Sequence, residues 1–283
     1  MITLHKIDQL RRQVALWRQA GQRIALVPTM GNLHTGHLRL VDRARQLADR
    51  VIATIFVNPL QFGQGEDFES YPRTLEDDSQ KLEEYATDLL FAPAVSEVYQ
   101  RPQTEQTIVR VPGLSDILCG QFRPGHFAGV ATVVCKLFNM AQPDVAVFGE
   151  KDYQQLMVIR RMVEDLQIPV QIEGMATVRE ADGLAMSSRN GYLTVEERAK
   201  APVVYQVLTQ TAEALQAGDQ DFKSLEESAW NSLENAGLRP DYFQIRRAQD
   251  LQSPDKEEKD LVILAAAYLG AARLIDNKTV TNR

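Results

Sequence analysis

The chain has 283 residues, of which 44% are hydrophobic and 24% charged, and its formal net charge is −7. This length allows one large domain or two unequal ones, with enough buried surface to fold without disulfides. The acidic balance argues against a nucleic-acid-binding protein, because such proteins usually present a basic stripe to phosphates. It suits an enzyme that acts on small molecules.

The cysteines and the N-terminal segment indicate a protein of the reducing cytoplasm. Cys119 and Cys135 form neither a CxxC pair nor a metal-ligand spacing, so we interpret them as ordinary thiols. Residues 1–17 predict an amphipathic helix and not a secretory signal. They lack the basic start and the apolar run of such a signal. No stretch is long and apolar enough to cross a membrane, and we expect no membrane partner.

Apolar runs alternate with helical patterns through the first two thirds of the chain. The runs at 24–30 and 50–58 enclose a helical pattern at 38–49, which predicts a βαβ unit and hence a parallel sheet with right-handed crossovers. The fold class predicted is therefore α/β, with a doubly wound, Rossmann-like parallel sheet. The later elements of this pattern are helices at 75–87, 127–141 and 153–167 and strands at 88–95, 144–149 and 169–178.

The pattern changes after Arg179. A predicted helix at 194–218 opens with Thr194 and Glu197, which match a capping box, and it ends at a glycine. A second helix is predicted at 222–236.

The last part of the chain predicts a small sheet. Its strands are expected within residues 241–249 and 260–280. We therefore predict two domains, a Rossmann-like domain over residues 1–178 and a smaller α+β domain over residues 179–283.

The loop after the first buried strand carries two histidines. In an open parallel sheet ligands bind beyond the carboxyl ends of the strands, so such loops hold the functional candidates. His34 and His37 stand three residues apart at a helix start, which puts both imidazoles on one side of the first turn. A helix N-terminus favours an anion and disfavours imidazolium, so we expect neutral histidines that donate to a phosphate. The alternative is that one histidine caps the helix or packs.

The second loop, residues 56–74, is long and polar. It offers the amides of Asn58 and Gln61 at a strand end, although a plain surface connection is an equally good interpretation. The helix that follows starts with Asp77 and Asp78. Acidic residues suit a first helical turn in any case, so a metal role for this pair is the weaker interpretation.

Two further loops supply cations. Arg123 lies in a Pro-Gly loop, where its guanidinium suits a carboxylate, a phosphate or a structural contact. Lys151 follows Gly149 at the end of a strand and suits a phosphate as a point charge. Asp152 and Gln155 also match a capping box, which leaves their role open.

A fifth loop, residues 178–193, contains Ser187, Ser188 and Arg189 between glycines. Two hydroxyls and a guanidinium suit a polyphosphate. Taken alone, the segment also fits a turn with local side-chain hydrogen bonds.

In this order the loops resemble those of a known family. HTGH at 34–37 resembles the HIGH signature of the class I synthetase and nucleotidyltransferase superfamily, and MSSRN at 186–190 stands where that superfamily carries its KMSKS-like loop. MSSRN has no lysine, so Arg189 and Lys151 would share the cationic role. Over about residues 24–193 the chain is similar to the pantothenate synthetase family, through PTMGNLHTGH, FVNPLQFG, YPRT, RPGHFAGVATVV, FGEKDYQQL and MSSRN.

The resemblance implies an AMP-forming ligase that joins pantoate to β-alanine with ATP and Mg²⁺, through a pantoyl adenylate. It implies that His34, His37 and Lys151 are catalytic, with His37 as a proton donor or a purely electrostatic group. The implied ATP-binding residues are Met30, Gly31, Asn32, Leu33, His34, Thr35, Gly36, His37, Gly149, Glu150, Lys151, Asp152, Val178, Met186, Ser187, Ser188 and Arg189.

The resemblance also implies the acceptor site and the assembly. Gln61 and Gln155 would bind pantoate, Gln61 would reach the β-alanine region, and Asn58 and Arg123 are further substrate-binding candidates. We expect a homodimer in which the second domain serves as a lid and in dimer contacts.

Three other functions fit parts of the pattern. An adenylyltransferase of the same superfamily shares HxGH but needs neither FVNPLQFG nor FGEKDYQQL and is usually shorter. A small relative of the aminoacyl-tRNA synthetases should bring basic residues, against the charge of −7. A catalytically silent nucleotide-binding module would not need five such loops at one sheet edge.

Overall fold

The computed structural model describes residues 1–63 and 65–281. The chain forms two compact units, one of Met1–Glu150 with Val158–Ala176 and the other of Lys151–Met157 with Thr177–Arg283. The predicted domains differ from these units in giving residues 151–157 and 177–178 to the first.

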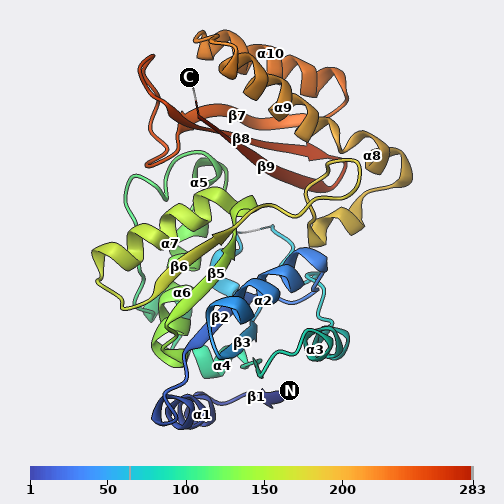
Figure 1. Cartoon of the computed structure of the whole chain (residues 1–283). Coiled ribbons are helices and arrows are strands. Elements are labelled where there is room, and N and C mark those ends of the chain that lie inside the picture. Colours follow the sequence, from blue (N-terminus) through green and yellow to red (C-terminus); the bar gives the residue numbers. More distant parts are fainter. Residues whose placement is uncertain (64, 282–283) are drawn as a thin grey trace. The chain divides into compact units, whose positions relative to one another are not determined.

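The first unit is built on a six-stranded sheet in the order β1-β4-β3-β2-β5-β6, with every neighbouring pair parallel (Figure 1). The central strands are apolar and buried along most of their length, as a parallel sheet covered on both faces requires. The predicted doubly wound sheet is confirmed. Its strands are β1 (Ile2–Leu4), β2 (Ile24–Thr29), β3 (Arg50–Ile55), β4 (Leu89–Phe91), β5 (Val145–Gly149) and β6 (Gln171–Met175).

The strand order reverses between β2 and β5, which lie side by side. From β2 the chain continues to β3 on one side, and from β5 it continues to β6 on the other. Right-handed crossovers that run in opposite directions place their helices on opposite faces of the sheet. Ligands of open α/β sheets bind at such a reversal, beyond the carboxyl ends of the two strands.

Helices connect the strands of this sheet. Helix α2 contacts β2, β3 and β5, whereas α6 contacts α1 and β2. Most residues of α6 are buried, in agreement with its apolar sequence. The helices are α1 (Ile7–Gln19), α2 (Thr35–Leu47), α3 (Leu75–Glu84), α4 (Val95–Val98), α5 (Cys119–Phe122), α6 (His126–Ala141) and α7 (Tyr153–Asp165), with 3-10 turns η1 (Pro59–Gln61), η2 (Gln103–Glu105) and η3 (Glu150–Asp152).

The second unit contains an antiparallel sheet in the order β7-β8-β9. Helix α10 packs on β7, and α9 packs on β8 and β9. Between them lies an apolar core that includes Leu208, Leu233 and Ile263. The predicted α+β character is confirmed. The elements are η4 (Ser188–Tyr192), α8 (Val195–Lys200), α9 (Val203–Gln216), α10 (Phe222–Asn235), β7 (Arg239–Arg247), β8 (Asp260–Leu269) and β9 (Ala272–Thr281).

Two sequence predictions of helices need correction. Residues 1–17 are not one helix, because Ile2–Leu4 forms β1 at the sheet edge, where it pairs with β4. A three-residue strand is too short to show a period, and its pairing is tertiary. Residues 194–218 form two helices that separate at Ala201 and Pro202, since proline supplies no N–H to the helical ladder.

The predicted capping box at the start of α8 is confirmed. The Thr194 hydroxyl accepts from the Glu197 N–H at 3.3 Å, and the Glu197 carboxylate accepts from the Thr194 N–H at 2.8 Å. Both donors belong to the first helical turn, which has no partners of its own for them.

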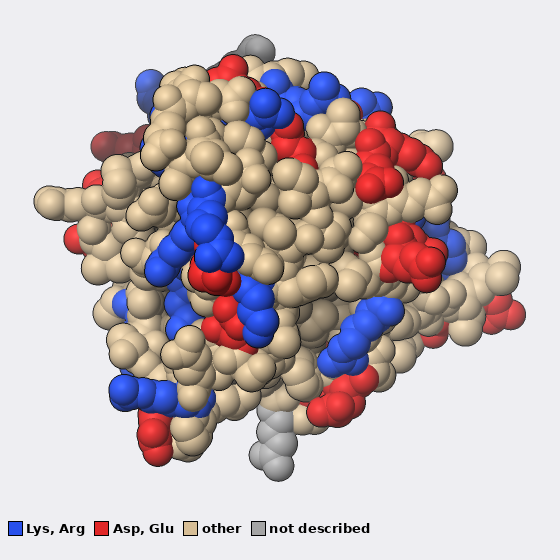
Figure 2. Space-filling model, turned by 90° about the horizontal axis from the view of Figure 1, so that it is seen from below, with Lys and Arg blue, Asp and Glu red and all other residues tan. Residues whose placement is uncertain are grey.

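Helices long and apolar enough to span a bilayer do not occur over residues 1–63 and 65–281. On the face drawn in Figure 2, basic and acidic side chains lie interspersed. Cys119 is buried and Cys135 half-buried, and neither forms a disulfide within the described chain.

Candidate active site

The loop after β2 is anchored by a buried carboxylate. Asp78 of α3 is fully buried, and its two oxygens accept from the N–H groups of Asn32 at 2.8 Å and Leu33 at 2.7 Å. The Thr74 hydroxyl donates to the same carboxylate at 3.0 Å, and Lys81 donates to the Leu33 carbonyl at 2.9 Å. Helix α3 therefore fixes the main chain that leads into the histidine segment.

Gly31 is required by this arrangement. Its φ is +84°, a region that L side chains rarely adopt, and a Cβ there would lie 3.1 Å from both the Asp78 carboxylate and the Ile55 side chain. The glycine thus lets the loop approach the carboxylate closely.

His34 and His37 lie together at the N-terminus of α2, with ring centroids 4.1 Å apart. His34 Nδ1 accepts from the Gly36 N–H at 3.1 Å, and His37 Nδ1 accepts from the His34 N–H at 3.4 Å. Because a backbone N–H can only donate, the neutral form of each ring carries its proton on Nε2. Capping through Nδ1 and donation through Nε2 use different nitrogens, so the two interpretations of these histidines are compatible.

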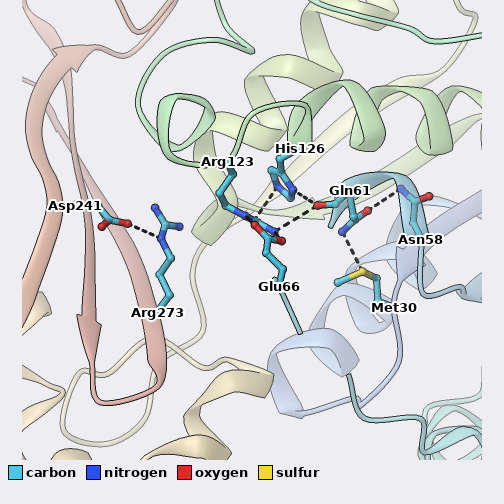
Figure 3. Close-up of polar contacts among 8 residues, drawn as sticks. All are labelled: Met30, Asn58, Gln61, Glu66, Arg123, His126, Asp241 and Arg273. Carbon is cyan, nitrogen blue, oxygen red and sulfur yellow. Dashed lines mark hydrogen bonds and ion pairs between the residues drawn. The ribbon is translucent and has the colours of Figure 1, made fainter. Parts of the chain in front are cut away.

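Gln61, in η1 after β3, reaches the loop that follows β2. Its Nε2 donates to Met30 Sδ at 3.0 Å, and its Oε1 accepts from Asn58 Nδ2 at 3.1 Å (Figure 3). Asn58 is itself nearly fully buried and also donates to the Gly129 carbonyl at 3.1 Å. The two predicted amides therefore form one unit, in which Asn58 decides which way the Gln61 amide faces.

Tyr99 completes the orientation of Asn58. Its hydroxyl donates to Asn58 Oδ1 at 2.8 Å. Burial raises the pKa of Tyr99 well above its usual value, which keeps the hydroxyl protonated as a donor. Sequence reasoning missed Tyr99, because it stands 41 residues from Asn58 and outside every predicted motif.

Gly129 of α6 explains how η1 comes so close to a helix. A Cβ at this position would lie 2.2 Å from the Leu60 carbonyl oxygen and 2.7 Å from the Gln61 nitrogen. Only a residue without a side chain fits, so the helix and the Gln61 segment are packed main chain to main chain.

Arg123 binds a carboxylate of the protein itself. Its guanidinium binds the Glu66 carboxylate through two hydrogen bonds, from Nε at 2.7 Å and from Nη2 at 2.5 Å. Burial raises the pKa of Glu66, but the hydrogen bond and the charge of Arg123 outweigh it and lower that pKa below its usual value. The structural contact that the sequence left open for Arg123 is therefore present, with Glu66 as the partner.

His126 links this ion pair to the backbone carbonyl of Gln61. Its Nδ1 lies 2.8 Å from the Gln61 carbonyl and its Nε2 lies 3.2 Å from Arg123 Nη1. Since a carbonyl can only accept, Nδ1 carries the proton and Nε2 accepts from Arg123. Arg123, His126 and Glu66 therefore support the main chain of Gln61 (Figure 3).

In the second unit, the segment that follows β5 carries Lys151. The Lys151 side chain is 18% exposed and its Nζ lies 3.9 Å from the Asp152 carboxylate. Its backbone carbonyl accepts from Asn277 Nδ2 of β9 at 2.8 Å. Gly149 and Glu150 precede it at the end of β5, and Gln155 is half-buried in the first turn of α7.

The serine and arginine loop, which contains Ser187, Ser188 and Arg189, follows a tight hairpin. The Met186 N–H donates to the Val178 carbonyl at 3.0 Å, and Arg179 and Ala185 form a bridge next to it. Ser187 Oγ then accepts from the Arg189 N–H at 3.3 Å. The predicted turn with local side-chain bonds is thus present, and it gives the two serines and Arg189 a defined backbone.

The metal hypothesis for Asp77 and Asp78 is not carried forward. Both oxygens of Asp78 are directed at backbone N–H groups, and Asp77 is exposed. Among the described residues no group of three histidines, cysteines or acidic residues could hold a metal ion. The Asp78 carboxylate positions the loop instead.

Comparison with known proteins identifies one family over nearly the whole chain. The profile described as pantoate–β-alanine ligase matches residues 2–279. A pantothenate synthetase of Pseudomonas fluorescens (strain SBW25) is 59% identical over 281 residues, 99% of each chain.

Two solved structures agree with this match. The crystal structure of pantothenate synthetase from Thermus thermophilus has a TM-score of 0.91 at 45% identity and covers 98% of this chain and 99% of its own. The pantoate–β-alanine ligase from Francisella tularensis, complexed with beta-gamma ATP and β-alanine, has a TM-score of 0.81 at 35% identity and covers 98% and 97%.

Proposed function

Because the chain belongs to the pantoate–β-alanine ligase family, we propose that it joins pantoate to β-alanine with ATP and releases pantothenate, AMP and pyrophosphate. A carboxylate oxygen of pantoate attacks the α-phosphorus of ATP, pyrophosphate leaves, and pantoyl adenylate forms. The amine of β-alanine then attacks the acyl carbon, AMP leaves, the nitrogen loses a proton, and the amide remains. Neither step needs a covalent bond to the protein.

The contact between Gln61 and Met30 is the observation that carries this proposal. It brings the FVNPLQFG segment against the PTMG segment within one unit, at 3.0 Å. The loop proposed to bind the nucleotide therefore lies next to an amide of fixed orientation. Such an amide can hydrogen-bond the hydroxyl or carboxylate groups of pantoate beside the α-phosphate.

The phosphate groups would be bound by donors from several segments. His34 and His37 offer Nε2–H groups at a helix N-terminus, where an anion is favoured. Lys151 and Arg189 add positive charge, and Ser187 and Ser188 add hydroxyls. These groups stabilise the charge that develops during transfer, so His37 is proposed as an electrostatic group before a proton donor. The remaining backbone contacts to ATP are proposed for Gly31–Gly36, Gly149, Glu150, Asp152, Val178 and Met186.

Pantoate would be bound by Gln61 and Gln155, with Asn58 acting through Gln61. The hydrogen bond from Asn58 fixes the Gln61 amide so that Nε2 is the group presented toward Met30. Arg123 is proposed to act on the backbone of Gln61 together with His126, because Glu66 already binds its guanidinium.

Magnesium is proposed to enter with ATP. Mg²⁺ is usually bound through substrate phosphates, one or two carboxylates and water, and so needs no protein cage. This suits a chain whose described residues form no three-ligand cluster. The ion would screen the phosphate charge, and the residues named above need only bind the resulting complex.

A homodimer in the cytoplasm and a lid role for residues 179–283 are further parts of the proposal, supported by the family resemblance alone. Light scattering on the purified protein tests the first. A mass of one chain, 31.8 kDa, at micromolar concentration would exclude the dimer.

The activity is tested by measuring AMP release from ATP. We expect AMP and pantothenate in equal amounts only when pantoate and β-alanine are both present. Replacing pantoate by an analogue without its 2-hydroxyl should lower the rate, since the site would leave an amide unpaired. Protein that releases no AMP with the full substrate pair would exclude the proposed function.

A further inference from the structure

Two adjacent polar residues of the second unit are buried. Asp276 and Asn277 of β9 are only 5% and 7% exposed, and they pair with Ala265 and Leu264 of β8. Successive residues of a strand point to opposite faces of a sheet. Asp276 lies on the face of Leu274 and Val280, which belong to the apolar core, and Asn277 lies on the other.

Asp276 binds the hairpin that leads to the serine and arginine loop. Its carboxylate accepts two hydrogen bonds from Arg179, at 2.6 and 2.9 Å, and the Arg179 side chain is 19% exposed. Arg179 also donates to the Gly183 carbonyl at 3.1 Å, across the turn of its own hairpin. One guanidinium thus fixes both arms of the hairpin to β9.

Tyr205 of α9 completes this anchor. The Arg179 guanidinium carbon lies 3.7 Å from the centre of the Tyr205 ring. Gly183 has a φ of +92°, and a Cβ there would lie 2.6 Å from the same ring. The hairpin therefore packs against the aromatic ring. Only Leu184 and Ala185 separate Gly183 from Met186 along the chain.

Asn277 binds the lysine segment. Its Nδ2 donates to the backbone carbonyl of Lys151 at 2.8 Å. The backbone carbonyl of Asn277 accepts from Arg179 Nη2 at 3.4 Å, and the backbone N–H of Asn277 donates to Asp276 Oδ1 at 2.8 Å. The two residues therefore form one connected network with Arg179 and Lys151.

We propose that Asp276 and Asn277 are positioning residues for the adenylation step. Within the second unit they fix the main chain of Lys151 and the hairpin before Met186–Arg189 to one strand, and so set these two cationic segments relative to each other. The inference rests on the proposed roles of Lys151 and Arg189 toward ATP phosphates. Displacing a binding group by about 1 Å can cost on the order of 100-fold in rate, so such anchors have a measurable effect.

The test compares Asp276→Asn with Asp241→Asn. Asp241 and Arg273 form a second buried ion pair at 2.8 Å, which joins β7 to β9 of the same sheet (Figure 3). Both variants remove a buried charge and should lower the thermal midpoint alike. Pantoate-dependent exchange of pyrophosphate into ATP measures adenylation without β-alanine. We expect Asp276→Asn to slow the exchange about 10-fold or more, and Asp241→Asn to leave it within about 2-fold of wild type.

Asn277→Ala and Asn277→Ser test the contact between Asn277 and Lys151. They decide whether the positioning role holds if Asp276→Asn does not fold. Both remove the bond to Lys151, and Asn277→Ser keeps a polar side chain. We expect an increased KM for ATP and slower exchange, with the KM for β-alanine unchanged. Exchange like that of wild type in both Asn277 variants, or equal losses in Asp276→Asn and Asp241→Asn, would overturn the inference.

Lys151→Ala separates this inference from the proposed function. If Asn277 acts through Lys151, then adding Asn277→Ala to Lys151→Ala costs less than it does alone. A multiplicative loss would contradict the coupling. An active Lys151→Ala variant would remove Lys151 from the proposed ATP site, whereas a loss in Lys151→Ala with a normal Asn277→Ala would reject the positioning role alone.

Discussion

The histidine loop of the first unit and the serine and arginine loop of the second are each anchored by one buried aspartate, but in different ways. Asp78 accepts directly from the backbone N–H groups of Asn32 and Leu33. Asp276 acts through the side chain of Arg179. The first anchor does not depend on which side chains the loop carries beyond its glycine, whereas the second requires an arginine at one position.

The consequence concerns how each loop tolerates change. Asp78 holds the backbone of the residues directly before the N-terminus of α2, so the position of the histidines depends on two local hydrogen bonds. A side-chain anchor 97 residues away in sequence makes the second loop depend on the whole fold of its unit. Substitutions should therefore act differently at the two loops. In the histidine loop their effects should stay local, whereas the serine and arginine loop should also respond to substitutions elsewhere in the second unit.

The largest effect is expected at the histidines proposed to bind the transferring phosphate. His37→Ala should lower kcat/KM for ATP by about 100-fold or more, because a donor to the transferring phosphate is lost. Steady-state AMP release measures it. His5→Ala is the matched control, since His5 binds the Ala92 carbonyl at the edge strand. A folded His37→Ala enzyme with a normal rate would remove His37 from the mechanism.

Asp78→Asn should produce the next largest change. An amide offers one acceptor oxygen, so one of the two backbone N–H groups would face an NH₂ group. Leaving a buried donor unpaired costs about 1–3 kcal/mol, which urea unfolding would detect, and the KM for ATP should rise. Asp77→Asn, at an exposed position, should change stability by less than about 0.5 kcal/mol.

This pair also tests the earlier metal hypothesis. If Asp77→Asn raised the magnesium requirement while stability stayed the same, Asp77 would regain a role in metal binding. We expect both measurements to match those of wild type.

Asn58→Ala should have a smaller, substrate-specific effect. The Gln61 amide loses the donor that orients it, so the KM for pantoate should rise about 10-fold, as for the loss of one or two neutral hydrogen bonds. The KM for ATP should change little. Asn139→Ala is a suitable control, because Asn139 is exposed and its amide donates to the Cys135 carbonyl within the same helix, α6. Equal increases in both KM values would contradict a specific role for Asn58.

The smallest effect is a pH dependence of stability. Arg123 keeps the pKa of Glu66 in the folded protein below its value in the unfolded chain. The ion pair therefore stabilises the fold above the usual glutamate pKa, and this contribution is lost as the pH falls through the lowered value. Glu66→Gln should cost about 1 kcal/mol or less at pH 7, and this cost should shrink as the pH falls below the usual glutamate pKa. A difference that grew toward low pH would have the wrong sign.

Much of the fold follows from local pattern. The alternation of apolar runs and helical periods predicts the parallel sheet, and HTGH after a strand predicts donors at a helix start. The break at Pro202 was also readable in principle, because a proline stands inside the predicted helix 194–218. Strand β1 was not, since three residues carry no period and its partner β4 begins 87 residues later.

The site divides in the same way. The sequence by itself determined the residue types proposed for the site, because their spacing at strand ends is local: His34 and His37, Asn58 and Gln61. Only the tertiary structure decided what positions them. Asp78 resembled any first-turn acid, and the Asp276–Asn277 pair matched no motif. The segments that they anchor lie 45 to 126 residues away in the sequence, and such pairings arise from packing, which a local pattern does not encode.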